Sequence, residues 1–376
     1  MKTVDGSNLR NRHFTAAWNR HRVAGLTLVE LMVAITIGLI ILAAVARLFV
    51  SSRSTYNLEE SLARVQESGR FAMEFLAQDI RMAGYAGCSA NLSGTAVGNL
   101  VDPPADVSTF NPDGIAGYKY ACSSSCSGAL TEWDPDLPSD YFPSGSGHIQ
   151  PITGSDVVVI QRADTLSTHL TGNSDPSNAN IQILNTATLA SSVAAGDILM
   201  VSDCKSADVF KTTNTSSGSG KITIAHSSAS NTSNFLTHSY ENDAEIMKLI
   251  TRIYFIGRRS NGTANPPALF RRELANNASL NTYELVEGIE IMRLSYGEDT
   301  DTTGDKVPNI YRDPSAVGNW RKVITARVGL LVKTLDNVDR DPDTRTYDIA
   351  GNTAGPYNDN VRRRAFNSTI QLRNHF

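Results

Sequence analysis

An apolar run of 16 residues, Leu31–Ala46, follows directly after Glu30 and constrains the fold more than any other feature. Insertion scales assign a charged side chain in a membrane helix a cost of about 2.5–3.5 kcal/mol, so a carboxylate at the edge of this run predicts a function. The run is somewhat shorter than the roughly 20 residues that a spanning helix needs. Its apolar character nevertheless predicts a membrane helix, with an acid at its entrance.

The segment before the apolar run is basic. It contains one acidic residue, Asp5, and five basic residues, which are Lys2, Arg10, Arg12, Arg20 and Arg22. This leader carries a net charge of +4 and leaves about −8 for the rest of the 376-residue chain. The asymmetry predicts a cytoplasmic N-terminus and an exported remainder. An acidic exported part argues against nucleic acid as the main partner.

The small residue that could mark a cleavage site is Gly25, which lies before the apolar run. A secretory signal peptide has its site after the apolar region and loses that region on cleavage. Cleavage after Gly25 would instead keep the apolar segment, create a free amine on Leu26 and make Glu30 the fifth residue. The alternative interpretation is an N-terminal membrane anchor that is never cleaved.

The stretch Gly25–Glu30 resembles the class III leader of type IV prepilins and pseudopilins. The resemblance implies a prepilin peptidase that cleaves after Gly25 on the cytoplasmic side and methylates the amine of Leu26. It also implies that Glu30 acts in assembly, where the Leu26 amine of a neighbouring subunit would neutralise a charge that a lone helix compensates poorly. The alternative for Glu30 is an interfacial carboxylate that faces lipid headgroups.

A single long helix is predicted from about Leu26 to Ala83, because no proline interrupts this region and Gly84 offers a stop. In its second half apolar residues recur at three- and four-residue steps, which is typical of an amphipathic helix. The charged residues of this half, Asp79 among them, are expected on its solvent faces.

Beyond the helix the sequence predicts an irregular excursion at about 88–154, rich in Gly, Ser, Pro and Asp, and then a mainly antiparallel meander. The predicted strands are 157–160, 181–184, 197–201, 209–211, 221–224, 250–256, 268–271, 289–296, 323–332 and 368–372. The predicted fold class is α+β, a long N-terminal helix packed on a β-sheet head. The expected domains are a leader at 1–25, a helix at 26–84 with its transmembrane half at about 26–50, and a head at 85–376.

Four cysteines all follow the membrane segment, and an even count in an exported region favours disulfides. The favoured pairs are Cys122–Cys126, a local clip, and Cys88–Cys204, a long-range link. A zinc site and free buried thiols are the alternatives that the spacing leaves open.

An acidic turn, residues 299–305, imitates the start of a calcium loop, with oxygen ligands expected from Asp299, Asp301, Thr303 and Asp305. The twelfth position is Ile310, so the bidentate glutamate is missing, and an acidic surface turn is the alternative. The stretch Asp336–Asp343 is interpreted as a solvated loop. No cofactor is required by the sequence beyond this possible Ca²⁺, and we predict that the protein is not an enzyme.

Patches of the remaining chain resemble the PilW family of type IV pilus assembly proteins. The matching segments are 81–88, 196–204, 209–210, 268–271, 285–289, 296–297, 319–320, 328–332 and 372–374. The family usually has an acid before the tryptophan, whereas this chain has Asn319.

This resemblance implies a type IV pilin-like fold and a minor pilin that helps prime and assemble type IV pili, as part of a tip or initiation complex. The implied partners are other minor pilins, the major pilin, the prepilin peptidase and the inner-membrane assembly platform. The implied location is the inner membrane, with the head in the periplasm, and then the pilus on the cell surface, in keeping with twitching motility and adhesion. The alternatives are a minor pseudopilin of a type II secretion system and a membrane-tethered adhesin.

Overall fold

The computed structural model describes residues 25, 27–88, 96–101, 111, 113–145, 148–172, 174–185, 192–259, 265–274, 280–301 and 305–374. By its internal contacts the chain divides into two compact units, Met1–Tyr56 and Asn57–Phe376. The predicted leader lies outside the described residues except for Gly25, as does Leu26.

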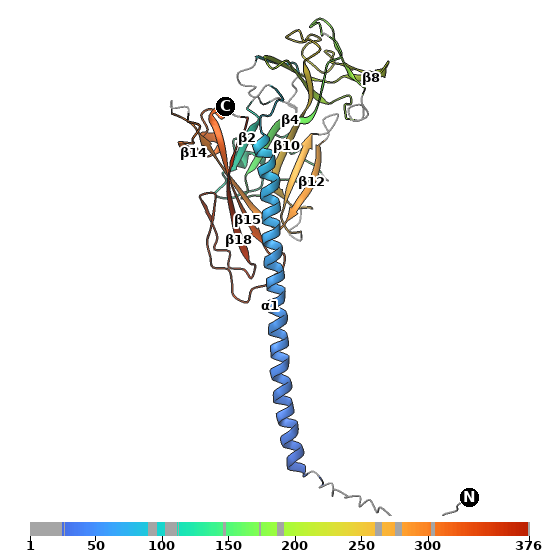
Figure 1. Cartoon of the computed structure of the whole chain (residues 1–376). Coiled ribbons are helices and arrows are strands. Elements are labelled where there is room, and N and C mark those ends of the chain that lie inside the picture. Colours follow the sequence, from blue (N-terminus) through green and yellow to red (C-terminus); the bar gives the residue numbers. More distant parts are fainter. Residues whose placement is uncertain are drawn as a thin grey trace, which may run out of the picture. The chain divides into compact units, whose positions relative to one another are not determined.

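One helix, α1, runs from Leu28 to Met82 over 55 residues and confirms the long N-terminal helix expected from the sequence (Figure 1). Gly84 follows two residues after the helix end, and its φ of 72° lies in the left-handed region that glycine adopts without strain. The Gly84 amide donates to the Gln161 carbonyl oxygen at 2.9 Å, so the turn that follows the helix is bonded directly to the sheet.

In the second unit α1 buries one stripe, which includes Val65, Ala72, Leu76 and Ile80. The spacing of three and four residues places these side chains on one face, as the sequence predicted. Gly69 belongs to the same stripe, and a Cβ atom there would collide with the ring of Phe366. A glycine at this position therefore lets the helix approach strand β18 closely.

The head is mainly antiparallel, as predicted, and its described residues form four sheets. The largest has nine strands: β1 (Ala96–Asn99), β7 (Ser206–Lys211), β6 (Ile198–Ser202), β10 (Glu245–Gly257), β4 (Val157–His169), β2 (Ile115–Tyr120), β3 (Trp133–Asp134), β11 (Ala268–Leu274) and β12 (Leu280–Glu287). The second has four strands in the order β14 (Ile310–Arg312), β13 (Ile289–Glu298), β15 (Val323–Lys333) and β18 (Arg363–Gln371). The other two are a three-stranded sheet of β5 (Asn180–Leu184), β9 (Lys221–Ala225) and β8 (Asn214–Gly218), and a hairpin of β16 (Tyr347–Ile349) and β17 (Asn352–Ala354).

The strand order corrects the predicted meander. Strand β10 pairs with β4 on one side, while its other side is shared between β6 at its start and β11 at its end. Strand β1 pairs with β7 in parallel. Alternation of apolar and polar residues located the strands, but it carries no information on which strands pair, because pairing depends on long-range packing.

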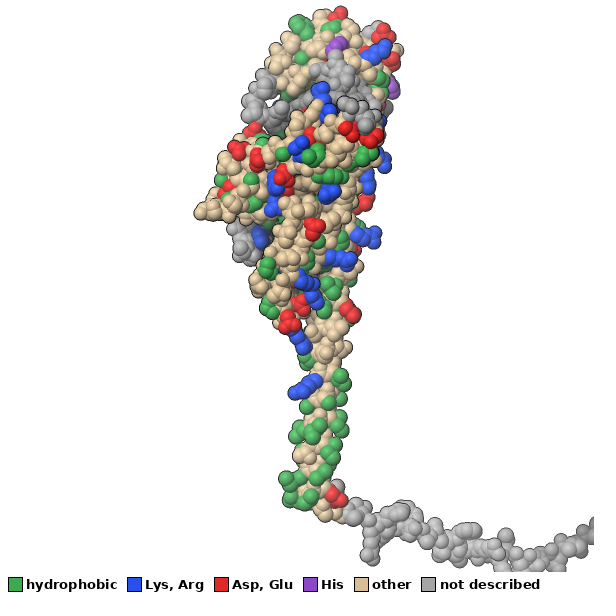
Figure 2. Space-filling view, turned by 90° about the vertical axis from the view of Figure 1, so that its left-hand side faces the viewer, with side chains coloured by type: hydrophobic (Ala, Val, Ile, Leu, Met, Phe, Trp, Pro, Cys, Tyr) green, Lys and Arg blue, Asp and Glu red, His purple; other side chains and the backbone are tan. Residues whose placement is uncertain are grey.

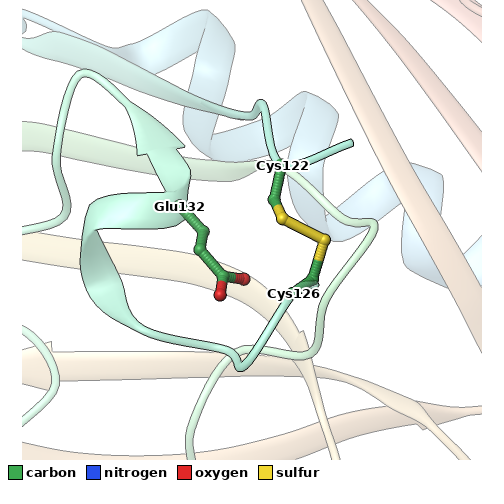
Figure 3. Close-up of side chains that lie close together, drawn as sticks. All are labelled: Cys122, Cys126 and Glu132. Carbon is green, nitrogen blue, oxygen red and sulfur yellow. A yellow bond between two sulfur atoms is a disulfide. The ribbon is translucent and has the colours of Figure 1, made fainter. Parts of the chain in front are cut away.

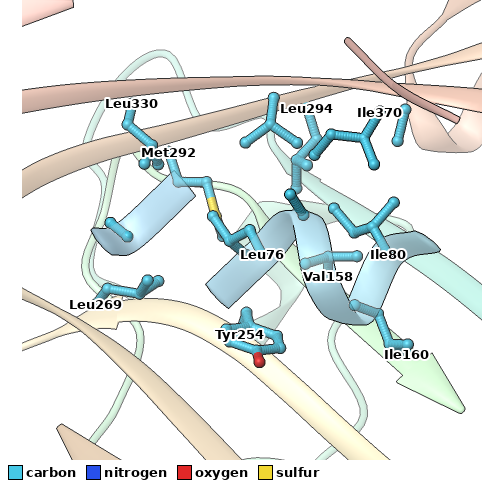
Figure 4. Close-up of a cluster of buried hydrophobic side chains, with 14 of the residues drawn as sticks. Leu76, Ile80, Val158, Ile160, Tyr254, Leu269, Met292, Leu294, Leu330 and Ile370 are labelled. Atoms are coloured by element: carbon cyan, nitrogen blue, oxygen red, sulfur yellow. The ribbon is translucent and has the colours of Figure 1, made fainter. Parts of the chain in front are cut away.

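The main core joins α1 to both large sheets. Leu76 and Ile80 of the helix meet Val158 and Tyr254 of the nine-stranded sheet and Met292 of the four-stranded sheet, together with their neighbours (Figure 4). Leu76, Ile80, Val158 and Met292 are fully buried. Each such side chain contributes about 1.5–3 kcal/mol through burial, so this cluster holds the second half of α1 in the head.

The excursion predicted as irregular at about 88–154 contains regular structure where it is described. Strand β2 joins the nine-stranded sheet beside β4, and β3 follows a short 3-10 helix, Leu130–Glu132. Trp133 and Phe142 form a second buried cluster against β10 and β11. The sequence missed this because the aromatic anchors are isolated among turn residues and show no period.

Candidate functional site

The N-terminal half of α1 exposes its apolar side chains. Figure 2 shows hydrophobic side chains along this part of the helix. Every residue from Leu31 to Ala46 is exposed except Gly38, which is intermediate. By length and composition α1 is long and apolar enough to cross a membrane, and its most apolar window is 0% buried. An apolar surface of this kind requires lipid or other helices as partners, because water disfavours it.

Glu30 lies in the first turn of α1 and is exposed. The Thr27 amide donates to Glu30 Oε2 at 2.9 Å, the Thr27 hydroxyl lies 3.0 Å from the same oxygen, and the Glu30 amide donates to Thr27 Oγ1 at 3.2 Å. These reciprocal bonds form a capping box. The sequence analysis expected a poorly compensated charge, whereas the structure gives Glu30 local donors. Its role in assembly stays a prediction, as do cleavage after Gly25 and methylation of Leu26.

The opposite end of α1 carries a second carboxylate, Asp79, and here the sequence prediction was wrong. Asp79 is 2% exposed rather than on a solvent face. Arg252 donates to its two oxygens at 2.8 and 2.9 Å, and the Tyr254 hydroxyl donates at 2.5 Å. Arg162 lies 3.5 Å away. The spacing of Asp79 from the buried Leu76 is three residues, which is the signal that could have placed it on the packed face.

The Asp79 site extends into a chain of ion pairs. Arg252 also contacts Glu273 at 2.7 Å, and Glu273 contacts Arg271 at 3.0 Å. Burial raises the pKa of the Tyr254 hydroxyl, and the neighbouring Asp79 carboxylate raises it further, so this group stays a donor. A buried carboxylate with two hydrogen-bonded partners fixes the helix against β10, since any shift would leave a charge unpaired.

The two disulfides of the structure are the pairs that the sequence favoured. Cys88, just after α1, joins Cys204 at the turn between β6 and β7, across 116 residues and with a Cα–Cα distance of 5.2 Å. Cys122 joins Cys126 at 5.9 Å. The first pair fastens the chain that leaves the helix to the nine-stranded sheet, and the second closes a small loop.

Glu132 lies beside the Cys122–Cys126 loop (Figure 3). Partial burial raises its pKa, but hydrogen bonds from Ser127, Gly128 and Tyr120 outweigh this and lower it to about 2. Cys122, Cys126 and Glu132 are close enough together to bind a metal ion. Both sulfur atoms are bonded to each other in the disulfide, however, so they offer no thiolate ligands. The glutamate instead organises the loop by accepting from its backbone.

Three carboxylates of the predicted calcium turn converge. Ligand atoms of Asp299, Asp301 and Asp305 lie within 4.8 Å of one another, while Thr303 lies outside the described residues. Asp301 already accepts from the Asn309 side chain at 2.7 Å. Oxygen donors of this kind fit Ca²⁺ in type. Its binding here stays a prediction.

The second acidic stretch, residues 336–343, is a mostly exposed loop, as predicted, but Asp343 in it is buried. Asp343 is 3% exposed and accepts from the Tyr347 hydroxyl at 2.6 Å and from Arg345 Nε at 2.8 Å. Asp339 pairs with Arg362 at 2.9 Å. These acids therefore stabilise the segment that leads to β16.

The asparagine that replaces the expected acid before the tryptophan caps a short 3-10 helix, Trp320–Lys322. The Asn319 side chain accepts from the Arg321 amide at 3.0 Å. Trp320 packs edge-to-face on Tyr296 with ring centroids 4.7 Å apart. Asparagine and aspartate cap equally well, so the departure leaves this local structure intact.

Comparison with known families gives two matches. Residues 20–46 match the Prokaryotic N-terminal methylation motif, and residues 253–374 match the family described as Type IV Pilus-assembly protein W. No curated protein sequence matches the chain. The first match and the fold together define a type IV pilin-like protein, built from a long apolar helix and a β-sheet head. Within that class the second match shows that residues 253–374 are similar to the PilW family, which supports the resemblance drawn from the sequence.

The two matches together indicate a type IV pilus-related minor pilin and point to a structural protein. The leader motif and the apolar helix indicate membrane anchoring. The matched residues 253–374 include strands β11 to β18, and β11, β12, β13, β15 and β18 contribute side chains to the core against which α1 packs.

Proposed function

We propose that this protein is a minor pilin that helps to prime and assemble type IV pili, within a tip or initiation complex of minor pilins. The observation that carries the proposal is the difference between the exposed N-terminal half of α1 and its packed C-terminal half. One half exposes an apolar surface of membrane-spanning length, and the other is fixed in a head of the PilW family. Such a chain can move from lipid into a bundle of helices while its head keeps its fold.

In this proposal residues 1–25 are a leader that the prepilin peptidase removes, and Leu26 is methylated. Residues 26–84 form the helix with its membrane half at about 26–50, and residues 85–376 form a periplasmic head that later reaches the pilus or cell surface. The partners are other minor pilins, the major pilin and the assembly platform. The basic leader supports this orientation through the positive-inside rule.

In this scheme Glu30 fixes the register between the helices of neighbouring subunits. In the part of the chain that the structure describes, the donors to its carboxylate come from Thr27, just before the helix. In a helix bundle the positive Leu26 amine of a neighbour would complete its neutralisation, and a buried pair of this kind penalises every other register.

The test is complementation of a strain that lacks this gene. The wild-type chain is expected to restore surface filaments and to show an N-terminus at Leu26 with one added methyl group by mass spectrometry. Glu30→Ala is expected to be processed and folded but to reduce filament number at least about tenfold, as loss of a specific charge pair would.

The matched control is Glu59→Ala, which removes an exposed acid of the same helix outside the apolar segment. It is expected to restore filaments fully. Normal filaments with Glu30→Ala would disprove the role of Glu30, and a chain that keeps Met1–Gly25 in its working form would disprove the maturation scheme.

A further inference from the structure

A groove of about 530 Å³ lies on the second unit, between α1 and the ends of β12 and β15. We call it the α1–β12 groove. Its lining residues are Ser61, Arg64, Val65, Glu67, Ser68, Phe71, Phe75, Leu285, Val286, Glu287, Lys333, Thr334, Leu335 and Asp336. Phe71 and Leu335 leave about half of their surface exposed, at 53% and 47%. Large apolar side chains around a concave surface indicate a contact site.

The wall that α1 contributes has the spacing of a helix ridge. Arg64, Ser68, Phe71 and Phe75 follow one another at four, three and four residues, beside the stripe that enters the core. Rows of this spacing form the ridges and grooves into which a second helix packs. The groove is therefore shaped for a helix that runs along α1.

The basic and acidic side chains that line the groove differ in whether they form salt bridges. Arg64 pairs with Glu60 at 2.6 Å, and Lys333 pairs with Glu290 at 3.3 Å, so both basic residues of the lining already have acidic partners.

The three acids of the lining, Glu67, Glu287 and Asp336, form no salt bridge among the residues that the structure describes. The basic residue Arg259 interacts electrostatically with Glu287 but is itself paired with Glu284. The rim is thus an acidic border around an apolar floor.

We propose that the α1–β12 groove docks an amphipathic α-helix of a partner protein, with an apolar ridge flanked by Lys or Arg. The ridge would cover Phe71 and Leu335, and the basic flanks would pair with the unpartnered carboxylates. This goes beyond the proposed function, because filament packing through the apolar half of α1 requires no contact at this place.

The experiment measures peptide binding to the full chain in nanodiscs by fluorescence anisotropy. The first peptide is a synthetic helix with leucines at four- and three-residue spacing and flanking lysines. The second has the same leucines and flanking glutamates. The lysine peptide is expected to bind at least about tenfold more tightly, and the difference is expected to shrink as salt screens the rim.

Three variants locate the contact. Leu335→Asp is expected to weaken both peptides about tenfold or more, because it places a charge on the apolar floor. The double variant Glu287→Lys with Asp336→Lys is expected to reverse the preference toward the glutamate peptide. Phe235→Asp changes an equally exposed apolar residue outside the groove and is expected to bind as the wild type does.

Leu335 is half exposed, so its substitution does not remove core packing, and near-ultraviolet circular dichroism verifies the fold of each variant. Equal binding of the two peptides would overturn the proposal. So would unchanged binding by Leu335→Asp, which would place the contact elsewhere. Neither outcome bears on filament assembly, so the proposed function is tested separately by the complementation experiment.

Discussion

The two halves of α1 contrast in how they hold an acid. Among the described residues Glu30 is exposed and bonded to Thr27, just before its own helix, whereas Asp79 is buried and bonded to two residues of β10. The apolar side chains that follow Glu30 are exposed, whereas those around Asp79 belong to the main core. One continuous helix thus carries one end that still needs partners and one end that already has them.

The contrast teaches where specificity lies in this protein. At Asp79 the charge pairing is intramolecular and fixes the helix in its own head. At Glu30 our proposal assigns the completing partner to another molecule. A buried charge with its partners sets one register, because alternatives leave a charge unpaired.

The largest expected effect comes from Asp79→Ala. Removing one partner of a buried ion pair typically costs about 3–5 kcal/mol. Here the buried Tyr254 hydroxyl would lose its acceptor, and Arg252 would lose one of its two carboxylate partners. Thermal melting of the full chain in detergent should therefore show a much lower Tm. The triple variant Asp79→Leu, Arg252→Leu and Tyr254→Phe should recover part of the loss, and an unchanged Tm for Asp79→Ala would break the comparison.

A second test replaces one leucine in each half. Leu76→Ala should destabilise the head by about 2–5 kcal/mol, because it empties a fully buried position. Leu42, which is 66% exposed, should leave the same melting transition unchanged when it becomes alanine. Urea denaturation followed by tryptophan fluorescence measures both. Equal effects would show that the two halves are not distinct in packing.

The close approach of α1 to β18 gives a third test. Gly69→Val places branched carbons where the Phe366 ring already lies, so overpacking should cost about 1–3 kcal/mol. The combination with Phe366→Ala should restore part of that loss, because it removes the clash. Gly38→Val offers the control, since a Cβ there meets nothing within 4 Å. A neutral Gly69→Val would mean that the helix can move away from the sheet.

The smallest expected effect is at the capping box. Thr27→Ala removes the hydroxyl that bonds Glu30 and should cost the helix start about 1 kcal/mol. Thr27→Ser should be neutral, because it keeps the hydroxyl. Amide hydrogen exchange of the first turn in detergent measures the difference, while the Tm of the head should stay constant. Equal exchange in both variants would show that the box does not hold the helix start.

Much of this architecture could be predicted from the sequence. The apolar run with Glu30, the uninterrupted helix that stops at Gly84 and the strand-like runs all depend on local order along the chain, such as period, charge and a glycine stop. The cysteines belong partly to this group, since their even count favoured disulfides and their positions favoured the two pairs that the structure contains.

Only the tertiary structure decided the rest. It buried Asp79 and Asp343, which look like surface charges in the sequence, because their partners lie far away in the chain or across a turn. It set the strand order around β10 and built β2 and β3 from a segment without a period. It also formed the α1–β12 groove from residues on a helix and two strands. Such features arise from packing between distant segments, and no local pattern records which segments will meet.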